Sequence, residues 1–191
     1  FSGRVTTLES ATAHIPEGQD FAAAATLPIV ALTAYYSLQA LAGLGPDDTL
    51  LVHGAAGGVG LAAIQYAQHV GARVIATAGT EEKRALLRLL GVVHVADSRS
   101  LSFVDDVKRW TDGAGVDVAL NSLAGEAMSA TLGLMRPFGR FIELGKRDFF
   151  ENTEVGLKRL RQNVSYLAVD ADQLLAAKPE TAARLFREVE A

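Results

Sequence analysis

The stretch Thr49-Leu50-Leu51-Val52-His53-Gly54-Ala55-Ala56-Gly57-Gly58-Val59-Gly60 decides the fold of this chain. It joins a short apolar run to a glycine-rich loop, and residues 61–70 then place apolar side chains at helical spacing. A loop that turns sharply from a strand into a helix, and whose backbone N–H groups approach a pyrophosphate, needs residues without bulk. Glycines stand at 57, 58 and 60, although Ala55 replaces the first glycine of the usual fingerprint. The stretch predicts a dinucleotide-binding loop, with a simple tight turn as the alternative.

Strand-like and helix-like segments alternate along the rest of the chain. Strands are expected at 49–53, 73–77, 92–95, 116–120, 140–144 and 164–169. Helices are expected at 21–25, 29–41, 61–70, 81–90, 102–110 and 125–135, with a helix-like segment at 155–161. Gly71 is expected as a C-terminal cap, Thr80 as an N-cap, and Ser102 with Asp105 as a capping box. Because parallel strands need crossover connections, this alternation predicts an α/β fold with a doubly wound, mostly parallel sheet of about six strands, the Rossmann type.

Composition excludes several classes of function. The chain has 191 residues, 49% of them hydrophobic, which is enough for one full core. A net charge of -4 leaves no basic field for nucleic acid. There is no Cys, and the four His lie far apart, so no metal site is expected. No apolar stretch is long enough for a membrane helix, and the start at Phe1 has no Met and no signal-peptide pattern, so we expect an internal piece of a longer cytoplasmic chain.

The end of the second expected strand bears on the choice of nucleotide. An acidic residue there would bind the ribose 2'-hydroxyl of NAD, but the sequence has Gly79 and Thr80. Thr80 and Lys83 could accept a 2'-phosphate, with Arg84 or Arg99 as helpers. The sequence therefore favours NADP over NAD, unless Lys83 is an ordinary solvated helix residue.

Several motifs resemble a known family. Leu27-Pro28, Thr33-Ala34-Tyr35, the loop 55–60, Ala78-Gly79-Thr80, Asp97-Ser98-Arg99 and Asn121-Ser122-Leu123-Ala124-Gly125 resemble quinone oxidoreductase-type members of the medium-chain dehydrogenase/reductase superfamily. With Gly139 to Asp148 and Asn163-Val164-Ser165 added, the set is similar to enoyl reductase domains of polyketide synthases and animal-type fatty acid synthases. The resemblance covers residues 15–175, and Gly54 departs from it, because relatives usually have a hydroxyl residue there.

The resemblance implies a reaction and a set of site residues. NADPH would transfer hydride to the β-carbon of a trans-2-enoyl thioester on acyl carrier protein, and the α-carbon would then be protonated. Lys146 and Asp170 match the positions proposed for this chemistry, with Asp172 as an alternative to Asp170; a structural ion pair and a helix cap are the competing interpretations. Asn121 and Ser122 would meet the nicotinamide or cap the next helix. The expected cofactor-binding residues are Ala56, Gly57, Gly58, Val59, Gly79, Thr80, Lys83, Arg99, Asn121, Ser122, Leu144 and Gly145.

The resemblance also implies a domain division and partners. Residues 1–28 would be the tail of a GroES-like substrate domain with a linker, 29–175 the NADP-binding domain, and 176–191 a helix that leads back to the substrate domain. Expected partners are acyl carrier protein with its phosphopantetheine-linked substrate and the other domains of a synthase, and a homodimer is a further option. A free-standing quinone or alkene reductase and a noncatalytic structural domain remain alternatives, while the lack of Cys disfavours a zinc alcohol dehydrogenase.

Overall fold

The computed structural model describes residues 3–7, 9, 12, 14–15 and 17–190. The domain tail predicted at 1–28 thus includes residues outside the described ones, namely 1, 2, 8, 10, 11, 13 and 16. The strands are β1 (Thr49–Val52), β2 (Arg73–Ala78), β3 (His94–Asp97), β4 (Val116–Asn121), β5 (Met135–Glu143) and β6 (Ser165–Ala168). The helices are α1 (Phe21–Ala25), α2 (Pro28–Tyr35), α3 (Gly58–Val70), α4 (Glu81–Leu89), α5 (Phe103–Trp110), α6 (Glu126–Leu132), α7 (Arg147–Phe150), α8 (Ala171–Ala177) and α9 (Pro179–Glu190), with a π-helix η2 (Tyr36–Leu41) and a 3-10 helix η3 (Leu157–Leu160).

One six-stranded sheet organises the molecule, in the order β3-β2-β1-β4-β5-β6. Every adjacent pair is parallel. The predicted doubly wound sheet is therefore confirmed. The strand order reverses between β1 and β4, and open α/β sheets bind ligands at the carboxyl ends of the strands at such a switch point.

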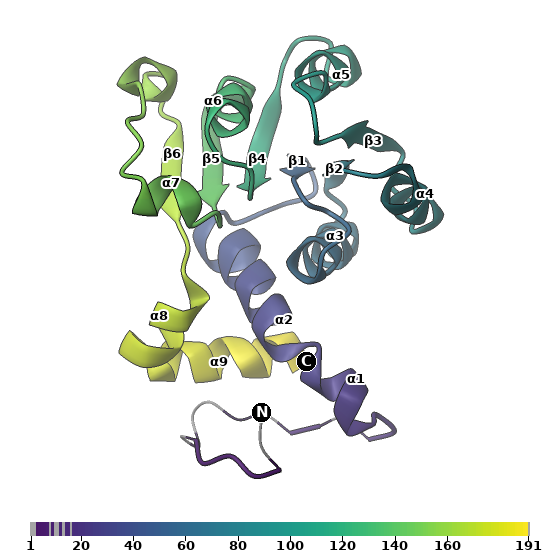
Figure 1. Cartoon of the computed structure of the whole chain (residues 1–191), viewed down its shortest axis with the longest axis vertical. Coiled ribbons are helices and arrows are strands. Elements are labelled where there is room, and N and C mark those ends of the chain that lie inside the picture. The colour runs from purple at the N-terminus through teal and green to yellow at the C-terminus, as the bar shows by residue number, and fades with distance from the viewer. Residues whose placement is uncertain (1–2, 8, 10–11, 13, 16, 191) are drawn as a thin grey trace.

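The two faces of the sheet bury separate apolar cores. Along β1, Leu50 and Val52 lie in a core with residues of α2, α3 and α4, whereas Leu51 lies in a core with residues of α5 and α6. Successive side chains of a strand point to opposite faces, so this fully buried strand is apolar throughout. Helices thus cover both faces of the sheet, as Figure 1 shows.

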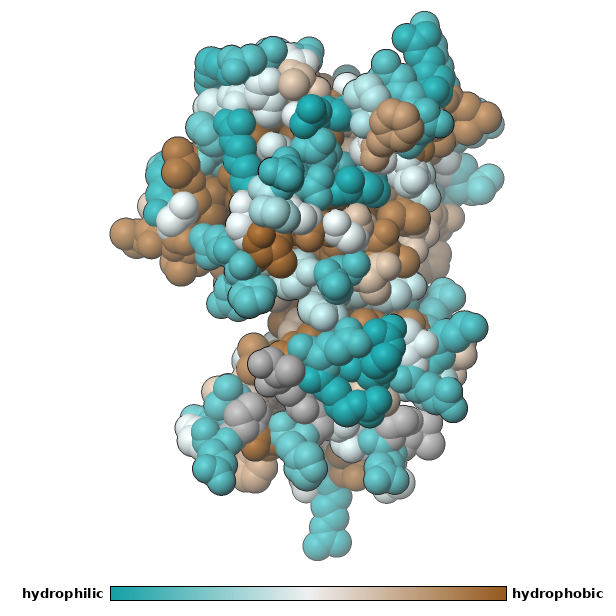
Figure 2. Space-filling view, turned by 180° about the vertical axis from the view of Figure 1, so that it is seen from behind, coloured by the Kyte–Doolittle hydropathy of each residue, from teal (hydrophilic) through white to brown (hydrophobic). Residues whose placement is uncertain are grey.

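A smaller helical part lies below the sheet in Figure 1 and contains α1, α8 and α9. Figure 2 shows both parts from behind, with a narrower waist between them. Helix α9 packs on α2 through a cluster that includes Leu32, Leu185 and Phe186. Among the described residues, no helix is both long and apolar enough to cross a membrane.

Several element boundaries differ from the sequence-based expectation. Strand β3 begins at His94 rather than at residue 92, because Gly91 adopts a φ of 87° and Val92 donates to the Leu87 carbonyl at 3.1 Å, which keeps Val92 at the end of α4. Strand β5 begins at Met135 rather than at 140, with a register irregularity opposite β4 and a φ of 63° at Phe138. Helix α6 accordingly ends at Leu132.

The expected helix ends are partly confirmed. Gly71 ends α3 with a φ of 81°, and the Thr80 side chain accepts a hydrogen bond from the Lys83 amide at 3.4 Å. The capping box at Ser102 is wrong: this residue has helical dihedral angles, its side chain makes no cap, and its hydroxyl bonds that of Ser100 at 2.7 Å. The apolar helix expected at 29–41 changes into η2 at Tyr36.

Candidate cofactor and substrate site

The glycine-rich loop lies between the carboxyl ends of three strands. Its flanks are tied to both neighbours of β1, because the His53 amide donates to the Leu120 carbonyl and the Ala55 amide to the Thr77 carbonyl, each at 3.0 Å. Helix α3 then begins at Gly58, and its N-cap, Gly57, offers no side-chain hydrogen bond. The first amides of a helix lack partners within it. Those that follow Ala56 and Gly57, at Gly58 and Val59, therefore form an anion-binding end at the switch point.

Two of the glycines also meet close packing demands. A Cβ at Gly60 would lie 2.5 Å from the Ala55 Cα, and one at Gly58 would lie 2.7 Å from Cγ1 of Val30 on α2. Gly58 therefore lets α3 approach α2, a role additional to the expected approach of pyrophosphate. The loop is a cradle that Cβ atoms would fill, and it fits a dinucleotide.

His53 supports the loop from below and was not expected from the sequence. It is 3% exposed, and burial lowers its pKa to about 3. Its Nδ1 lies 2.8 Å from the Thr77 hydroxyl and its Nε2 lies 2.9 Å from that of Thr131. Because Thr131 already donates to the Ala127 carbonyl at 2.8 Å, it accepts from Nε2–H, so Nδ1 accepts from Thr77. His53 is thus a neutral structural residue.

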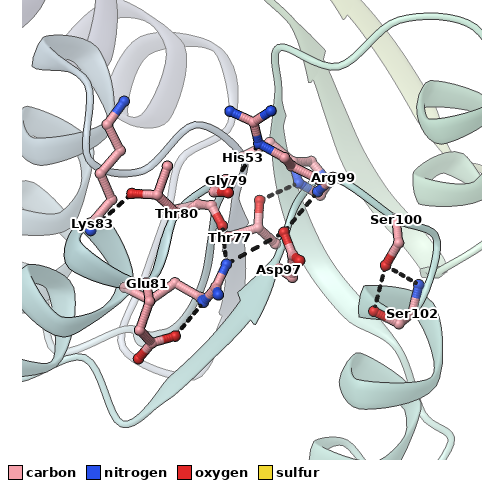
Figure 3. A network of polar contacts seen from close by, with 12 residues as sticks. His53, Thr77, Gly79, Thr80, Glu81, Lys83, Asp97, Arg99, Ser100 and Ser102 are labelled. Atoms are coloured by element: carbon pink, nitrogen blue, oxygen red, sulfur yellow. Dashed lines mark hydrogen bonds and ion pairs between the residues drawn. The ribbon is translucent and has the colours of Figure 1, made fainter.

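The end of β2 forms the expected nucleotide-selecting corner. Figure 3 shows Lys83 and Arg99 extending on the two sides of the turn at Gly79 and Thr80. Arg99 Nε donates to the Gly79 carbonyl at 2.9 Å, which holds the guanidinium beside this turn. Arg84 instead pairs with carboxylates, at 3.0 Å from Glu81 and 3.3 Å from Asp97. Of the two proposed helpers, Arg99 is therefore the better placed.

Buried polar side chains join the carboxyl ends of β4 and β5. Asn121 is fully buried, and its Nδ2 donates to the Leu123 carbonyl at 2.7 Å and to Glu143 Oε2 at 2.5 Å. Glu143, also fully buried, accepts from the Gly145 amide at 2.6 Å through Oε1. Both amide hydrogens of Asn121 are thus used within the protein. A side-chain hydrogen bond to a nicotinamide amide would fall to Ser122, whose hydroxyl donates to the His53 carbonyl at 3.4 Å.

Lys146 and both candidate acids lie together, although 24 residues separate Lys146 from Asp170. Lys146 Nζ is 3.0 Å from Asp170 Oδ1 and 3.4 Å from Asp172 Oδ2. The Asp170 carboxylate raises the pKa of Lys146, and the ammonium lowers the pKa of Asp170. Asp170 also caps α8 by accepting from the Asp172 amide at 3.2 Å. The ion pair and the helix cap therefore both exist, and neither prevents a role in chemistry.

A cavity of about 530 Å³ opens beside this ion pair. Lys146 and Asp170 supply its charged groups, and most of its other walls are aromatic or aliphatic. The lining residues are Tyr36, Lys146, Phe149, Phe150, Ala168, Val169, Asp170, Gln173 and Leu174. Such a cavity suits an apolar ligand with one polar group that is held beside the cation.

Fold and site together define a dinucleotide-binding domain of the Rossmann class. The model of the zinc-binding dehydrogenase family matches residues 58–175. The chain is 50% identical over 171 residues to a hybrid PKS-NRPS synthetase of Aspergillus niger, covering 88% of this chain and 4% of that protein. It is 44% identical to the nucleotide-binding subdomain of the enoylreductase domain of PpsC from Mycobacterium tuberculosis (TM-score 0.82; 85% of this chain, 90% of that one) and 38% identical to the CurK enoyl reductase (TM-score 0.87; 97% and 55%).

The chain belongs to this dehydrogenase family and, within it, to the enoyl reductase domains of polyketide synthases. It spans between 4% and 9% of the length of its curated relatives. The zinc in the family's description does not fit these residues: over the part of the chain that the structure describes, no three His, Cys, Asp or Glu side chains are grouped to hold a metal ion.

Proposed function

We propose that this chain is the cofactor-binding part of an NADPH-dependent enoyl reductase that acts on a trans-2-enoyl thioester carried by acyl carrier protein. The observation that supports it most directly is the Lys146–Asp170 pair in an apolar cavity at the carboxyl edge of the sheet. Family membership supports the same reaction class. Other domains of a parent synthase would supply the carrier protein and the rest of the substrate site.

The cofactor-binding residues would follow the carboxyl edge. The amides after Ala56 and Gly57 would bind the pyrophosphate, and Thr80, Lys83 and Arg99 would bind the 2'-phosphate beside Gly79. Ser122, Leu144 and Gly145 would line the nicotinamide end, as the neighbours of the buried Asn121 and Glu143. NADPH, when bound, supplies hydride to the β-carbon.

Lys146 would polarise the thioester carbonyl. Because its pKa is raised by the Asp170 carboxylate, it remains an ammonium at neutral pH and can stabilise negative charge that develops on the thioester oxygen. The same shift makes it a weaker acid, so the geometry favours polarisation over direct delivery of the α-proton. Asp170 would orient the ammonium, and it suits this role better than Asp172, since its side chain is 31% exposed against 77%.

The apolar walls of the cavity would receive the acyl chain. Phe149 and Phe150 lie one turn beyond Lys146, and Leu174 lies on the opposite side of Asp170 in the sequence. An acyl chain held there has its thioester within reach of the cation. Burial of each methylene is worth about 0.8 kcal/mol, so these walls would favour chains that fill the cavity.

The proposal is tested with the complete reductase, in which this chain is joined to its substrate domain. Crotonyl-loaded acyl carrier protein is added with NADPH or NADH, and loss of cofactor absorbance and formation of the butyryl thioester are measured together. NADPH oxidation coupled to butyryl formation is expected, with NADH much slower. Oxidation with a quinone but not with crotonyl thioester would assign the chain to a quinone reductase, and oxidation of neither would leave a noncatalytic domain.

A further inference from the structure

One buried acid has no part in the chemistry described above. Glu143 is the last residue of β5, it is fully buried, and it forms no ion pair of the described set. Its two carboxyl oxygens accept from different segments: Oε2 from Asn121 at the end of β4, and Oε1 from the Gly145 amide. A buried charge is costly unless its hydrogen bonds are satisfied, so a residue of this type at this place needs an explanation.

The backbone around Glu143 connects both halves of the Lys146–Asp170 pair. The Glu143 carbonyl accepts from the Val169 amide at 3.0 Å, directly before Asp170. Its side chain holds the Gly145 amide, directly before Lys146. A Cβ at Gly145 would lie 2.7 Å from Glu143 Oε1, so the carboxylate and the glycine backbone fit closely. Glu143 therefore lies where it fixes the direction in which the chain leaves β5.

We propose that Glu143 is a positioning residue that holds the loop 144–146, and with it Lys146, against the end of β4. As a carboxylate it accepts both the Asn121 amide and the Gly145 amide; as an uncharged group it binds them more weakly. The reach of Lys146 toward its partner and the substrate then depends on a group that touches neither. The consequence for catalysis rests on the proposed function, whereas the hold on the loop does not.

The surroundings of Glu143 set the pH at which the hold changes. Burial raises its pKa to about 7, opposed by the hydrogen bonds from Asn121 and Gly145 and assisted by the negative charge of Asp148. Asp148 is itself held by the Gly125 amide and the Thr153 hydroxyl. On β6, Tyr166 faces both acids, and burial raises its pKa to about 12, so it stays neutral. The carboxylate form therefore gains population as the pH rises through neutrality.

The first test uses the 191-residue chain and needs no activity. Nitrogen-15 NMR follows the Gly145 and Lys146 amides while the pH is raised through neutrality. In the wild-type chain the Gly145 amide is expected to shift with a midpoint near pH 7, matching the raised pKa. In Glu143→Gln this titration disappears and the Lys146 amide moves. The control, Glu151→Gln, removes an exposed carboxylate that pairs with Arg147, and leaves the Gly145 titration intact. A Gly145 amide that ignores both the pH and Glu143→Gln overturns the proposal.

The second test measures turnover of the complete reductase with crotonyl-loaded carrier protein. Wild-type kcat is expected to rise through neutral pH, and Glu143→Gln to lower kcat about 10-fold or more, without that rise and with KM for NADPH within about 3-fold. Gly145→Ala, which displaces the loop and keeps the acid, should lower kcat as well. If Glu143→Gln keeps the wild-type kcat and pH profile, the positioning role is wrong. If the wild-type enzyme does not reduce the thioester, the proposed function fails, and the Gly145 titration still decides whether Glu143 holds the loop.

Discussion

At the scale of single residues, the carboxyl edge separates side chains that serve the fold from those directed outward. His53, Asn121 and Glu143 are buried and hydrogen-bonded to neighbouring strands or loops. Lys146 extends into a cavity with about half of its side chain exposed. The first group sets where the loops lie, and substitutions there act through geometry. The second group can be removed with little effect on folding, so its variants report on ligand binding.

Cofactor choice is predicted to depend on the two cations beside Gly79. Lys83→Ala combined with Arg99→Ala should weaken NADPH binding to the chain by about 1 to 3 kcal/mol, the range for lost charge-assisted hydrogen bonds, and leave NADH unchanged. Isothermal titration calorimetry with both cofactors measures this. Lys108→Ala, at the exposed far end of α5, is the matched control. Equal loss for the two cofactors would mean that these cations do not select the 2'-phosphate.

Lys146 is predicted to act in turnover and not in cofactor binding. In the complete reductase, Lys146→Ala should lower kcat on a crotonyl thioester about 10-fold or more, equal to about 1.4 kcal/mol of barrier, with NADPH affinity nearly unchanged. The exposed Lys158, on η3 and outside the cavity lining, provides the control variant Lys158→Ala. Normal turnover with Ala at 146 would leave the carbonyl to another group.

At the scale of elements, the start of α3 depends on Gly60. An exposed Gly→Ala change within a helix usually gains up to about 1 kcal/mol of stability. At Gly60 the sign should reverse, because the new Cβ would lie 2.5 Å from the Ala55 Cα and backbone cannot turn aside as a side chain can. We expect a loss of about 1 to 3 kcal/mol in urea unfolding. The control Gly156→Ala meets no atom within 4 Å and should stay near wild type.

The sequence predicted elements well where one local pattern determined them. Strand β1 and helix α3 are marked by an apolar run, by glycines and by Gly71, and these features act over a few residues. The start of β5 was wrong because Pro137 and Gly139 suggest a break, whereas pairing with β4 extends the strand through an irregular register. The change from α2 into η2 has no feature in its own sequence that distinguishes it from an ordinary helix.

The candidate site was predictable in its members and not in its connections. Lys146 and Asp170 were expected from the family resemblance, but their contact depends on β5 and β6 lying side by side. Glu143 was missed, although one acid at the end of the apolar run Phe141-Ile142 is a detectable feature. What it binds depends on Asn121 in the adjacent strand, and a single sequence does not give that register.

At the scale of the whole molecule, His53 and Glu143 make opposite contributions to the pH dependence of folding. Since the pKa of His53 is lowered from 6.5 to about 3, the unfolded chain binds more protons between these values, and acid destabilises the fold. Since the pKa of Glu143 is raised from 4.5 to about 7, the folded chain binds more protons in that window, and stability falls as the pH rises through it. The two effects oppose each other from 4.5 to 6.5, and His53 acts alone below.

A variant separates these contributions. His53→Gln should be less stable than wild type at about pH 7.5, and the difference should shrink by about 1.4 kcal/mol per pH unit below about pH 6. Urea unfolding of the chain at several pH values measures it. His14→Gln removes an exposed histidine and should show a constant difference. A constant difference for His53→Gln as well would mean that His53 takes up its proton in the folded state.

The strand order has a consequence for synthesis on the ribosome. β1 is central in the finished sheet, yet its neighbour β4 follows it by more than sixty residues, so the first half of the chain has only β2 and β3 to pair with. At about 5 to 20 residues per second, the outer edge of β1 stays uncovered for roughly 3 to 13 seconds. During that interval the apolar Leu50–Val52 edge is open to pairing with another chain. Slower translation between β1 and β4 should therefore increase aggregation of the nascent polypeptide, whereas a delay after β6 should not.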